Sequence, residues 1–158
     1  MMGILQVASY IYKRYMDDFG VRIDEMKLHK LLYFTQRECL IQKGEPMFEA
    51  LFEAWKYGPV MVQIRQYYKN DSFPELMDKE QVVQYEPVFD MVFKTYAPQK
   101  SWSLSTLTNG EYSWKHAREG YDELDSCEVE MKTEDIMVDA NRVRERRAVL
   151  RQLNLYTA

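Results

Sequence analysis

The stretch that decides the fold begins with Lys27-Leu28-His29-Lys30-Leu31-Leu32-Tyr33-Phe34, continues through a Gly44-Glu45-Pro46 turn, and ends with Phe52-Glu53-Ala54-Trp55-Lys56-Tyr57-Gly58-Pro59-Val60. The apolar positions recur at the spacing of one helical face and predict a helix over residues 25–42; they are Leu28, Leu31, Leu32, Thr35 and Cys39. Asp24 stands at the N-cap position of this helix, and Gly44 stands where the helix should stop. The remaining elements are expected to be organised around it.

The segment after the Gly44 turn predicts a short β element within residues 45–57, because residues 52–55 are rich in aromatic side chains. So small an element is not stable alone and should pack on the helices. We expect Trp55 to fill the core, the alternative being that it anchors a partner, with Lys56 and Tyr57 as the exposed pair. Gly58 then turns the chain, and Pro59 is expected to open a helix over residues 59–69.

The other elements are predicted to be helices separated by short connections. A first helix is expected over residues 3–19, and Pro87 is expected to start a helix that ends before Pro98, since proline is unfavourable inside a helix. The stretch 75–86 is ambiguous between strand and helix. Short helices are predicted over residues 101–108, with Ser101 as the cap, and 113–119. The acidic stretch 120–132 is predicted to be an exposed loop, and Thr133 is expected to cap the last helix.

Length and composition indicate one globular domain over residues 1–158. Hydrophobic residues make up 46% of the chain and charged residues 29%. The sequence shows neither an apolar run of membrane-spanning length nor a signal peptide, so we expect a cytoplasmic protein. The net charge of −4 argues against nucleic-acid binding over the whole surface.

The cysteines and histidines do not indicate a chemical site. Cys39 lies on the apolar helical face and is expected to be a buried small hydrophobe, and Cys127 gives no disulfide framework in a reducing compartment. His29 is expected to be a surface or satisfied structural residue, and His116 adds no metal-ligand spacing. With no catalytic constellation visible, we expect neither a cofactor nor an enzyme activity.

Two polar clusters in the C-terminal third are candidate binding surfaces. Arginines three and four residues apart share one face of the last helix, namely Arg144, Arg147 and Arg151. They either meet an acidic partner or phosphate backbone, or they simply complement the helix dipole. The second cluster is Trp114 with His116 and Arg118, which forms a polar binding edge unless Trp114 is buried and the other two are solvated.

The order and spacing of several motifs resemble the Panacea domain of bacterial and phage antitoxins, also called SocA-like or GepA-like phage-associated proteins. The motifs, within residues 8–136, are Lys27 to Tyr33, Gly44 to Phe48, Glu53 to Val60, Trp102 to Thr108, Ser113 to Glu119 and Thr133 to Ile136. A histidine often follows the threonine that corresponds to Thr108, and this chain has Asn109 there. Any role of that histidine is therefore absent here.

The resemblance implies an antitoxin that neutralises, by direct protein–protein binding, a toxin encoded by an adjacent gene. Some relatives deliver the toxin to a host protease instead. The alternatives are a phage or mobile-element protein that binds a host defence protein, and a nucleic-acid-binding regulator that uses the last helix, which is the less favoured. The predicted fold is mainly α-helical with structural positions Leu31, Leu32, Trp55, Gly58, Pro59 and Trp114. The candidate partner-binding residues are Lys56, Tyr57, His116, Arg118, Arg144, Arg147 and Arg151.

Overall fold

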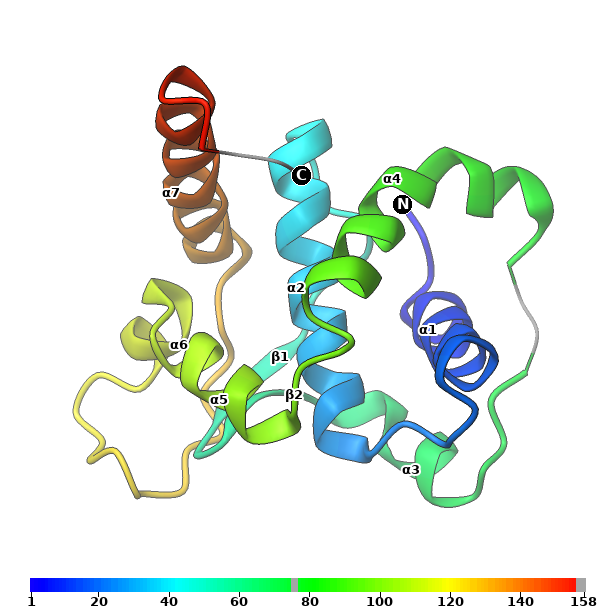
Figure 1. The fold of residues 1–158 in the computed structure, drawn as a ribbon. Helices are drawn as coiled ribbons and strands as arrows, with labels where there is room; N and C mark the ends of the chain where they lie inside the picture. Colours follow the sequence, from blue (N-terminus) through cyan, green and yellow to red (C-terminus); the bar gives the residue numbers. More distant parts are fainter. Residues whose placement is uncertain (75–76, 156–158) are drawn as a thin grey trace.

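Helix α2, Glu25–Lys43, lies at the centre of the structure, a computed structural model that describes residues 1–74 and 77–155. Figure 1 shows α1 and α4 on one side of α2, α7 on the other, and the small sheet with α5 and α6 near its N-terminal half. The other elements are α1 (Ile4–Phe19), β1 (Phe52–Trp55), β2 (Gly58–Met61), the 3-10 turn η1 (Val62–Ile64), α3 (Arg65–Lys69), α4 (Lys79–Thr95), α5 (Ser101–Asn109), α6 (Tyr112–Ala117) and α7 (Thr133–Gln152). The predicted mainly α-helical fold is confirmed.

The ends of α2 follow the capping residues that the sequence places there. The side chain of Asp24 accepts a hydrogen bond from the backbone N–H of Lys27 at 2.8 Å, which satisfies one of the free donors of the first turn. Gly44 has a φ of +74°, and its N–H donates to the carbonyl of Leu40 at 3.0 Å. Both predicted boundaries of the central helix are confirmed.

α2 is enclosed on all sides, although the sequence predicts only one apolar face. Every residue from Lys27 to Leu40 is buried. Most of the polar side chains tolerate this because the surrounding segments supply partners. The amide of Gln36, for example, donates to the carbonyl of Phe48 at 2.8 Å and accepts from the N–H of Met47 at 3.0 Å. These two bonds tie the chain after the Gly44 turn to the side of the helix.

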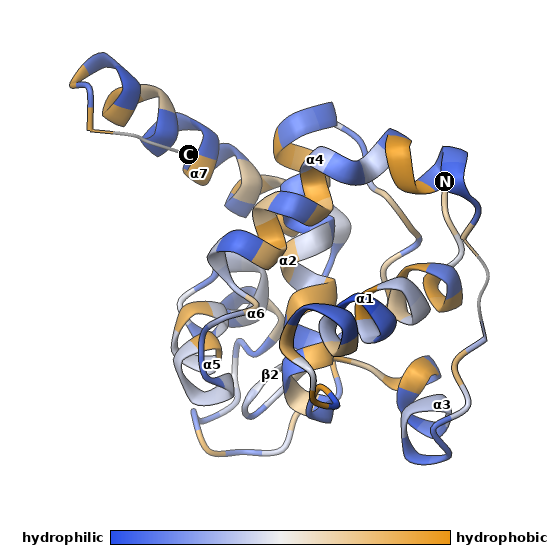
Figure 2. Cartoon of the chain, turned by 45° about the vertical axis from the view of Figure 1, so that its right-hand side comes forward, coloured by the Kyte–Doolittle hydropathy of each residue, from blue (hydrophilic) through white to orange (hydrophobic). Residues whose placement is uncertain are grey.

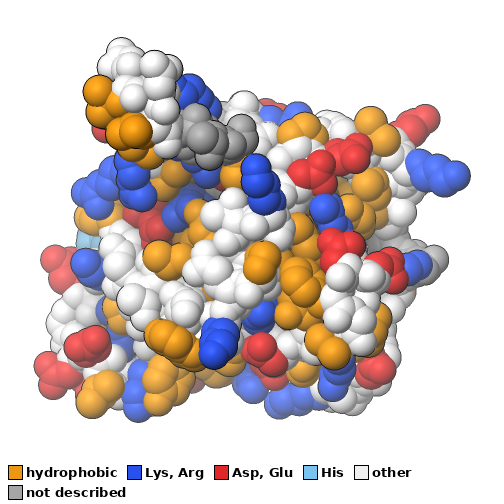
Figure 3. All heavy atoms as spheres, viewed as in Figure 1, with side chains coloured by type: hydrophobic (Ala, Val, Ile, Leu, Met, Phe, Trp, Pro, Cys, Tyr) orange, Lys and Arg blue, Asp and Glu red, His pale blue; other side chains and the backbone are white. Residues whose placement is uncertain are grey.

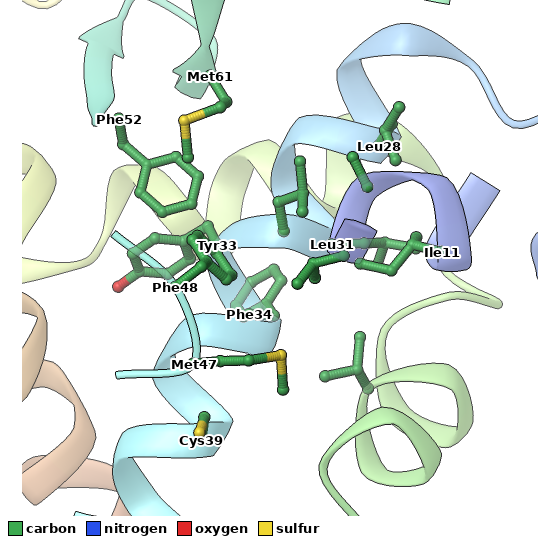
Figure 4. Close-up of a cluster of buried hydrophobic side chains, with 14 of the residues drawn as sticks. Ile11, Leu28, Leu31, Tyr33, Phe34, Cys39, Met47, Phe48, Phe52 and Met61 are labelled. Atoms are coloured by element: carbon green, nitrogen blue, oxygen red, sulfur yellow. The ribbon is translucent and has the colours of Figure 1, made fainter. Parts of the chain in front are cut away.

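The hydrophobic core gathers where α2 meets the small sheet and α1. Figure 4 shows Tyr33 and Phe34 of α2 beside Phe48, Phe52 and Met61, with Leu28, Leu31 and Ile11 on the far side. The ring of Phe34 stacks on Tyr96 with centroids 3.9 Å apart. Fully burying side chains of this size contributes roughly 1.5–3 kcal/mol each, so this cluster dominates the stability of the fold. Leu31 and Leu32 are both buried, as predicted.

The prediction that Pro59 starts a helix is wrong, because Gly58 and Pro59 lie in strand β2. β1 and β2 pair antiparallel with Phe52 opposite Met61 and Trp55 opposite Gly58, so residues 56–57 form the turn. Pro59 is tolerated there because β2 has β1 on one side and no partner strand on the other. The predicted third helix shortens to η1 and α3.

The prediction that Pro87 starts a helix is also wrong, since α4 begins eight residues earlier at Lys79 and contains Pro87. Asp78 and Gln81 form a capping box at its start. Pro87 has no N–H for the carbonyl of Val83, but Val83 is exposed and water can satisfy that carbonyl. α4 changes direction along its length (Figure 1). Residues 75–76 of the ambiguous stretch lie outside the described residues.

The acidic stretch 120–132 is irregular and mostly exposed, as predicted, but its end pairs with the sheet. The N–H of Ala54 donates to the carbonyl of Val129 at 2.9 Å, and the N–H of Met131 donates to the carbonyl of Phe52 at 2.7 Å. Thr133 and Ser101 are the first residues of α7 and α5 rather than their caps. Among the described residues, none of the helices combines the length and apolarity needed to cross a membrane.

Candidate partner-binding surfaces

The turn between β1 and β2 is fixed to α5, to α6 and to the residue after α6 by side chains that bind backbone carbonyls. The Nε1 of Trp114 donates to the carbonyl of Trp55 at 2.8 Å, and a guanidinium N–H of Arg118 donates to Ala54 at 2.8 Å. On the α5 side, Asn109 donates to the carbonyl of Lys56 at 3.3 Å, and Ser105 donates to that of Tyr57 at 2.9 Å. The four successive carbonyls from Ala54 to Tyr57 are therefore all held, and the turn is preorganised.

Trp114 and Arg118 serve this attachment and are buried. Arg118 also donates to the carbonyls of Asp122, Glu123 and Asp125, which fold the start of the acidic loop around its guanidinium. The alternative that Trp114 is buried is confirmed. The expectation that Arg118 belongs to an exposed edge is wrong, because its donors are used inside the molecule. His116 alone remains partly exposed, with its Nδ1 2.7 Å from Oδ2 of Asp135.

Trp55 is half-buried and lies at the surface, so the prediction that it fills the core is wrong. Side chains alternate along a strand, and β1 turns Phe52 and Ala54 inward and Trp55 outward. Cζ of Arg65 lies 5.0 Å from the centroid of the Trp55 ring. The Nε1 of Trp55 donates to the carboxylate of Glu53 at 2.9 Å. A cavity of about 360 Å³ opens beside it, lined by Met26, Trp55, Lys56, Tyr57, Ser126, Cys127 and Glu128.

The end of β1, the turn and the start of α5 carry four side chains at the surface that we call the hairpin-tip surface: Trp55, Lys56, Tyr57 and Trp102. Tyr57 is 59% exposed, as predicted, whereas Lys56 is half-buried. Trp102 is 69% exposed and precedes Ser105 by three residues, so it lies on the face of α5 that meets the turn. In the sequence, Trp102 is notable only as part of a family motif. Two features of the sequence could have indicated that Trp102 is exposed: it lies near a helix start, and it has no apolar neighbour at i+4.

A buried lysine lies beneath the same hairpin. Lys30 is 1% exposed. Burial lowers the pKa of Lys30 to about 8, and Asp24 opposes this. A Cβ added at Gly58, whose φ is +126°, would lie 3.2 Å from Cε of Lys30 and 2.9 Å from Oγ1 of Thr108. Gly58 is thus needed for close packing as well as for its backbone angle.

A second surface is a groove whose floor is α2 and whose walls are α4 and α7. Adjoining cavities of about 580 Å³ and 470 Å³ share Met91 of α4 and Arg147 of α7. We call it the arginine groove, because it is lined by Arg37, Arg142, Arg144, Arg146, Arg147 and Arg151. Figure 3 shows Lys and Arg side chains gathered below the free end of α7, with acidic and hydrophobic side chains beside them.

Two of the three arginines predicted to form a binding face are bound to α2. Arg147 makes two hydrogen bonds of 2.8 Å to the carboxylate of Glu38, whose side chain is 1% exposed. Arg144 donates to the carbonyls of Leu40 and Ile41, which belong to the last turn of α2. These contacts hold α7 against α2. Arg151 is exposed at the end of the groove.

The floor of the groove holds a second buried ion pair. Arg37 pairs with Glu111 and donates to the hydroxyl of Tyr96, while its Nε is buried without a partner among the described residues. Burial raises the pKa of Glu111 to about 7; the carboxylate of Asp139 adds to this and Arg37 opposes it. Asp139 accepts from Tyr33 at 3.0 Å and from the first N–H groups of α6.

His29, the remaining polar candidate, is a satisfied structural residue, as predicted. Its Nδ1 accepts from the N–H of Met61 at 3.1 Å, so the ring carries its proton on Nε2, which faces Glu25 at 3.0 Å. Burial lowers the pKa of His29 and favours this neutral form. Glu25 also accepts from Arg65, and these hydrogen bonds lower the pKa of Glu25 to about 2.

Comparison with known proteins gives the family of this helical fold. The model of the antitoxin SocA-like, Panacea domain matches residues 28–115. The chain therefore belongs to the SocA-like Panacea-domain family. The matched range runs from the central helix through the hairpin to α6, so it contains the whole hairpin-tip surface.

A curated relative supports this family over a shorter segment. Antitoxin SocA of Caulobacter vibrioides (strain NA1000 / CB15N) is 48% identical over 40 residues, which is 25% of this chain. The match spans 21% of the length of that relative. No solved structure matches the chain.

Proposed function

We propose that this protein is the antitoxin of a toxin–antitoxin pair and neutralises its toxin by binding it directly. The observation that carries the proposal is the Panacea domain itself, which spans the central helix and the hairpin. The similarity to the antitoxin SocA supports the same reading. The toxin is expected to be the product of an adjacent gene, and the bound complex is expected to involve no cofactor.

The hairpin-tip surface supports binding as the mode of action. Trp and Tyr are among the residue types enriched at binding hot spots. Here Tyr57 is exposed on a turn whose carbonyls are already held, and Trp102 is exposed near the start of α5. A preorganised surface loses little conformational entropy when a partner binds. The exposed aromatic side chains can therefore contribute most of their burial energy to the complex.

The alternative of nucleic-acid binding through α7 is less well supported. Phosphate contacts need arginines that point outward, whereas two of the three arginines predicted to form that face, Arg144 and Arg147, direct donors at α2. The net charge of −4 also opposes long-range attraction to a polyanion.

Co-expression with the adjacent gene tests the proposal. The adjacent gene alone should arrest growth of a heterologous host, and co-expression of this protein should restore growth and yield a complex that co-elutes in gel filtration. An unrelated helical protein expressed to the same level serves as the control. Toxicity that persists in the presence of folded protein, or rescue without complex formation, would contradict neutralisation by binding.

A further inference from the structure

The apolar face of α7 is covered by the rest of the molecule only along the first half of the helix. In the first half of the helix this face is buried, with Ile136, Ala140 and Val143 inside. Leu150 is half-buried, and Leu153 is 60% exposed. Figure 2 shows this half of α7 extending away from the other helices. The groove wall is thus longer than the body that packs against it.

The groove combines apolar walls with an excess of positive charge. Met91, Leu107, Val143 and Leu150 line the larger cavity, and Leu107 is 42% exposed. The six arginines of the groove share its lining with three acidic residues, Glu38, Glu111 and Asp139. The ion pairs and hydrogen bonds described above already occupy those three acids. The groove is therefore net positive in a chain whose net charge is −4.

The positive charge still available for a partner lies on one wall. Arg142 and Arg146 are exposed and line the larger cavity. Arg142 stacks over the ring of Tyr112 with Cζ 5.3 Å from the centroid, which leaves its edge N–H groups for a carboxylate. Arg142 and Arg146 are four residues apart, so they are neighbours along the helix and project over the apolar wall.

The dimensions of the groove favour a helical occupant. From Asp139 to Arg151 the wall spans roughly 18 Å, at about 1.5 Å per residue, which equals about three turns of a helix. An amphipathic helix in such a groove places apolar side chains at i, i+3, i+4 and i+7 against the floor and its polar side chains at the rim. Rim residues opposite Arg142 and Arg146 must be acidic to complement them.

We propose that the arginine groove binds an acidic amphipathic helix of the toxin. The inference rests on the proposed function, since it identifies the segment of the toxin that this protein recognises. The apolar face of that helix packs on Met91, Leu107 and Leu150, and its carboxylates bind Arg142 and Arg146. Arg147 and Arg144 keep the wall in place without contacting the partner's charges.

The test measures affinity for the purified toxin by calorimetry, using charge-reversal variants. Arg142→Glu/Arg146→Glu should weaken binding by about 100-fold, because it sets like charges against each other in a partly buried site. The matched control is Lys69→Glu/Lys79→Glu, which makes the same change in net charge at exposed positions outside the groove. The control should stay within about twofold of wild type at 150 mM salt, where distant charges are largely screened. Equal losses in both variants would overturn the groove as the binding site.

A second measurement identifies the segment. Labelled 20-residue peptides that tile the toxin are titrated against wild type and against Met91→Gln, which makes the groove wall polar at similar volume. The proposal predicts that the tightest peptide is net acidic with helical apolar spacing, and that Met91→Gln weakens it at least tenfold. A tightest peptide that is basic, or that binds Met91→Gln equally well, would overturn it.

The outcome is separable from that of the proposed function. If the wild type rescues growth and the Arg142→Glu/Arg146→Glu variant rescues equally and binds the toxin with unchanged affinity, the groove inference fails while the antitoxin function stands. If the wild type neither rescues growth nor binds the toxin, the proposed function fails. Normal circular dichroism and an unchanged Tm of both charge variants ensure that the comparison concerns binding alone.

Discussion

The hairpin-tip surface and the arginine groove differ in what holds them together. At the tip, side chains of buried or half-buried residues such as Trp114 and Asn109 bind backbone carbonyls, and the exposed side chain of Tyr57 is left free. In the groove, the charged side chains themselves are the attachment, as Arg147 and Glu38 show. A side chain can bind a partner only with groups that the fold has not already used. A count of charged residues therefore overestimates what the groove offers a partner and underestimates what the tip offers.

The largest expected effect concerns the groove. Arg147→Met leaves the buried carboxylate of Glu38 without its cationic partner, and should lower the free energy of unfolding by about 3–5 kcal/mol. Chemical denaturation measures this directly. The double variant Glu38→Gln/Arg147→Met should recover most of the loss, because neither partner is then charged. A double variant as unstable as the single one would mean that Arg147 acts by packing instead of by pairing.

The tip has its own structural weak point at Gly58. Gly58→Val places a branched side chain at a φ of +126° and against Oγ1 of Thr108, and should cost about 2–4 kcal/mol. Gly120→Val is the matched control, since Gly120 has a φ of +89° but no atom within 4 Å of an added Cβ. Thermal denaturation should show a clearly smaller loss for Gly120→Val. Equal losses of stability in the two variants would mean that backbone strain alone, and not the contact with Thr108, accounts for the effect at Gly58.

The bounds of the central helix were predictable from sequence, whereas the placement of Trp55 and Pro59 depends on contacts between distant segments. Asp24 and Gly44 set the bounds of α2 through local backbone chemistry, and local rules suffice there. Strand alternation would have placed Trp55 outside once Phe52 was assigned to the core, but the strand was too short to fix its register. Pro59 was misassigned because proline suits both a helix start and a strand without a partner on one side.

The groove was the harder region to predict. The helical spacing of Arg144, Arg147 and Arg151 is correct, yet spacing does not reveal that Glu38 lies opposite Arg147, more than a hundred residues away in the chain. The same holds for Arg37 and Glu111, which are distant in sequence and paired in the fold. Polar residues on a helix that is buried on every side read in sequence as a solvated face. Which partner covers each of them is a property of the tertiary structure.

Lys30, which lies beneath the hairpin, should make a smaller contribution to stability that depends on pH. Its pKa falls to about 8 in the folded protein from an ordinary value near 10.5, so between these values the unfolded chain binds more protons. Stability from this group should therefore rise as pH increases from about 8 to 10.5. Lys30→Met should abolish that rise and stabilise the protein by about 1 kcal/mol at pH 7. An unchanged pH profile in the variant would show that the ammonium reaches solvent.

Tyr57 gives the smallest expected change in stability and the sharpest contrast between the two regions. Its side chain is mostly exposed, so Tyr57→Ala should change the free energy of unfolding by less than about 0.5 kcal/mol. If the tip contacts the toxin, the same variant should weaken the complex by at least about tenfold, the loss typical of a hot-spot aromatic residue.

Combining Tyr57→Ala with Arg142→Glu/Arg146→Glu then tests whether one toxin molecule contacts both surfaces. The tip and the groove lie at different places on the molecule, so independent contacts should give free-energy losses that add. Additive losses in calorimetry would mean that the toxin contacts both surfaces at once. A tip variant that binds as tightly as wild type would leave the groove as the binding site.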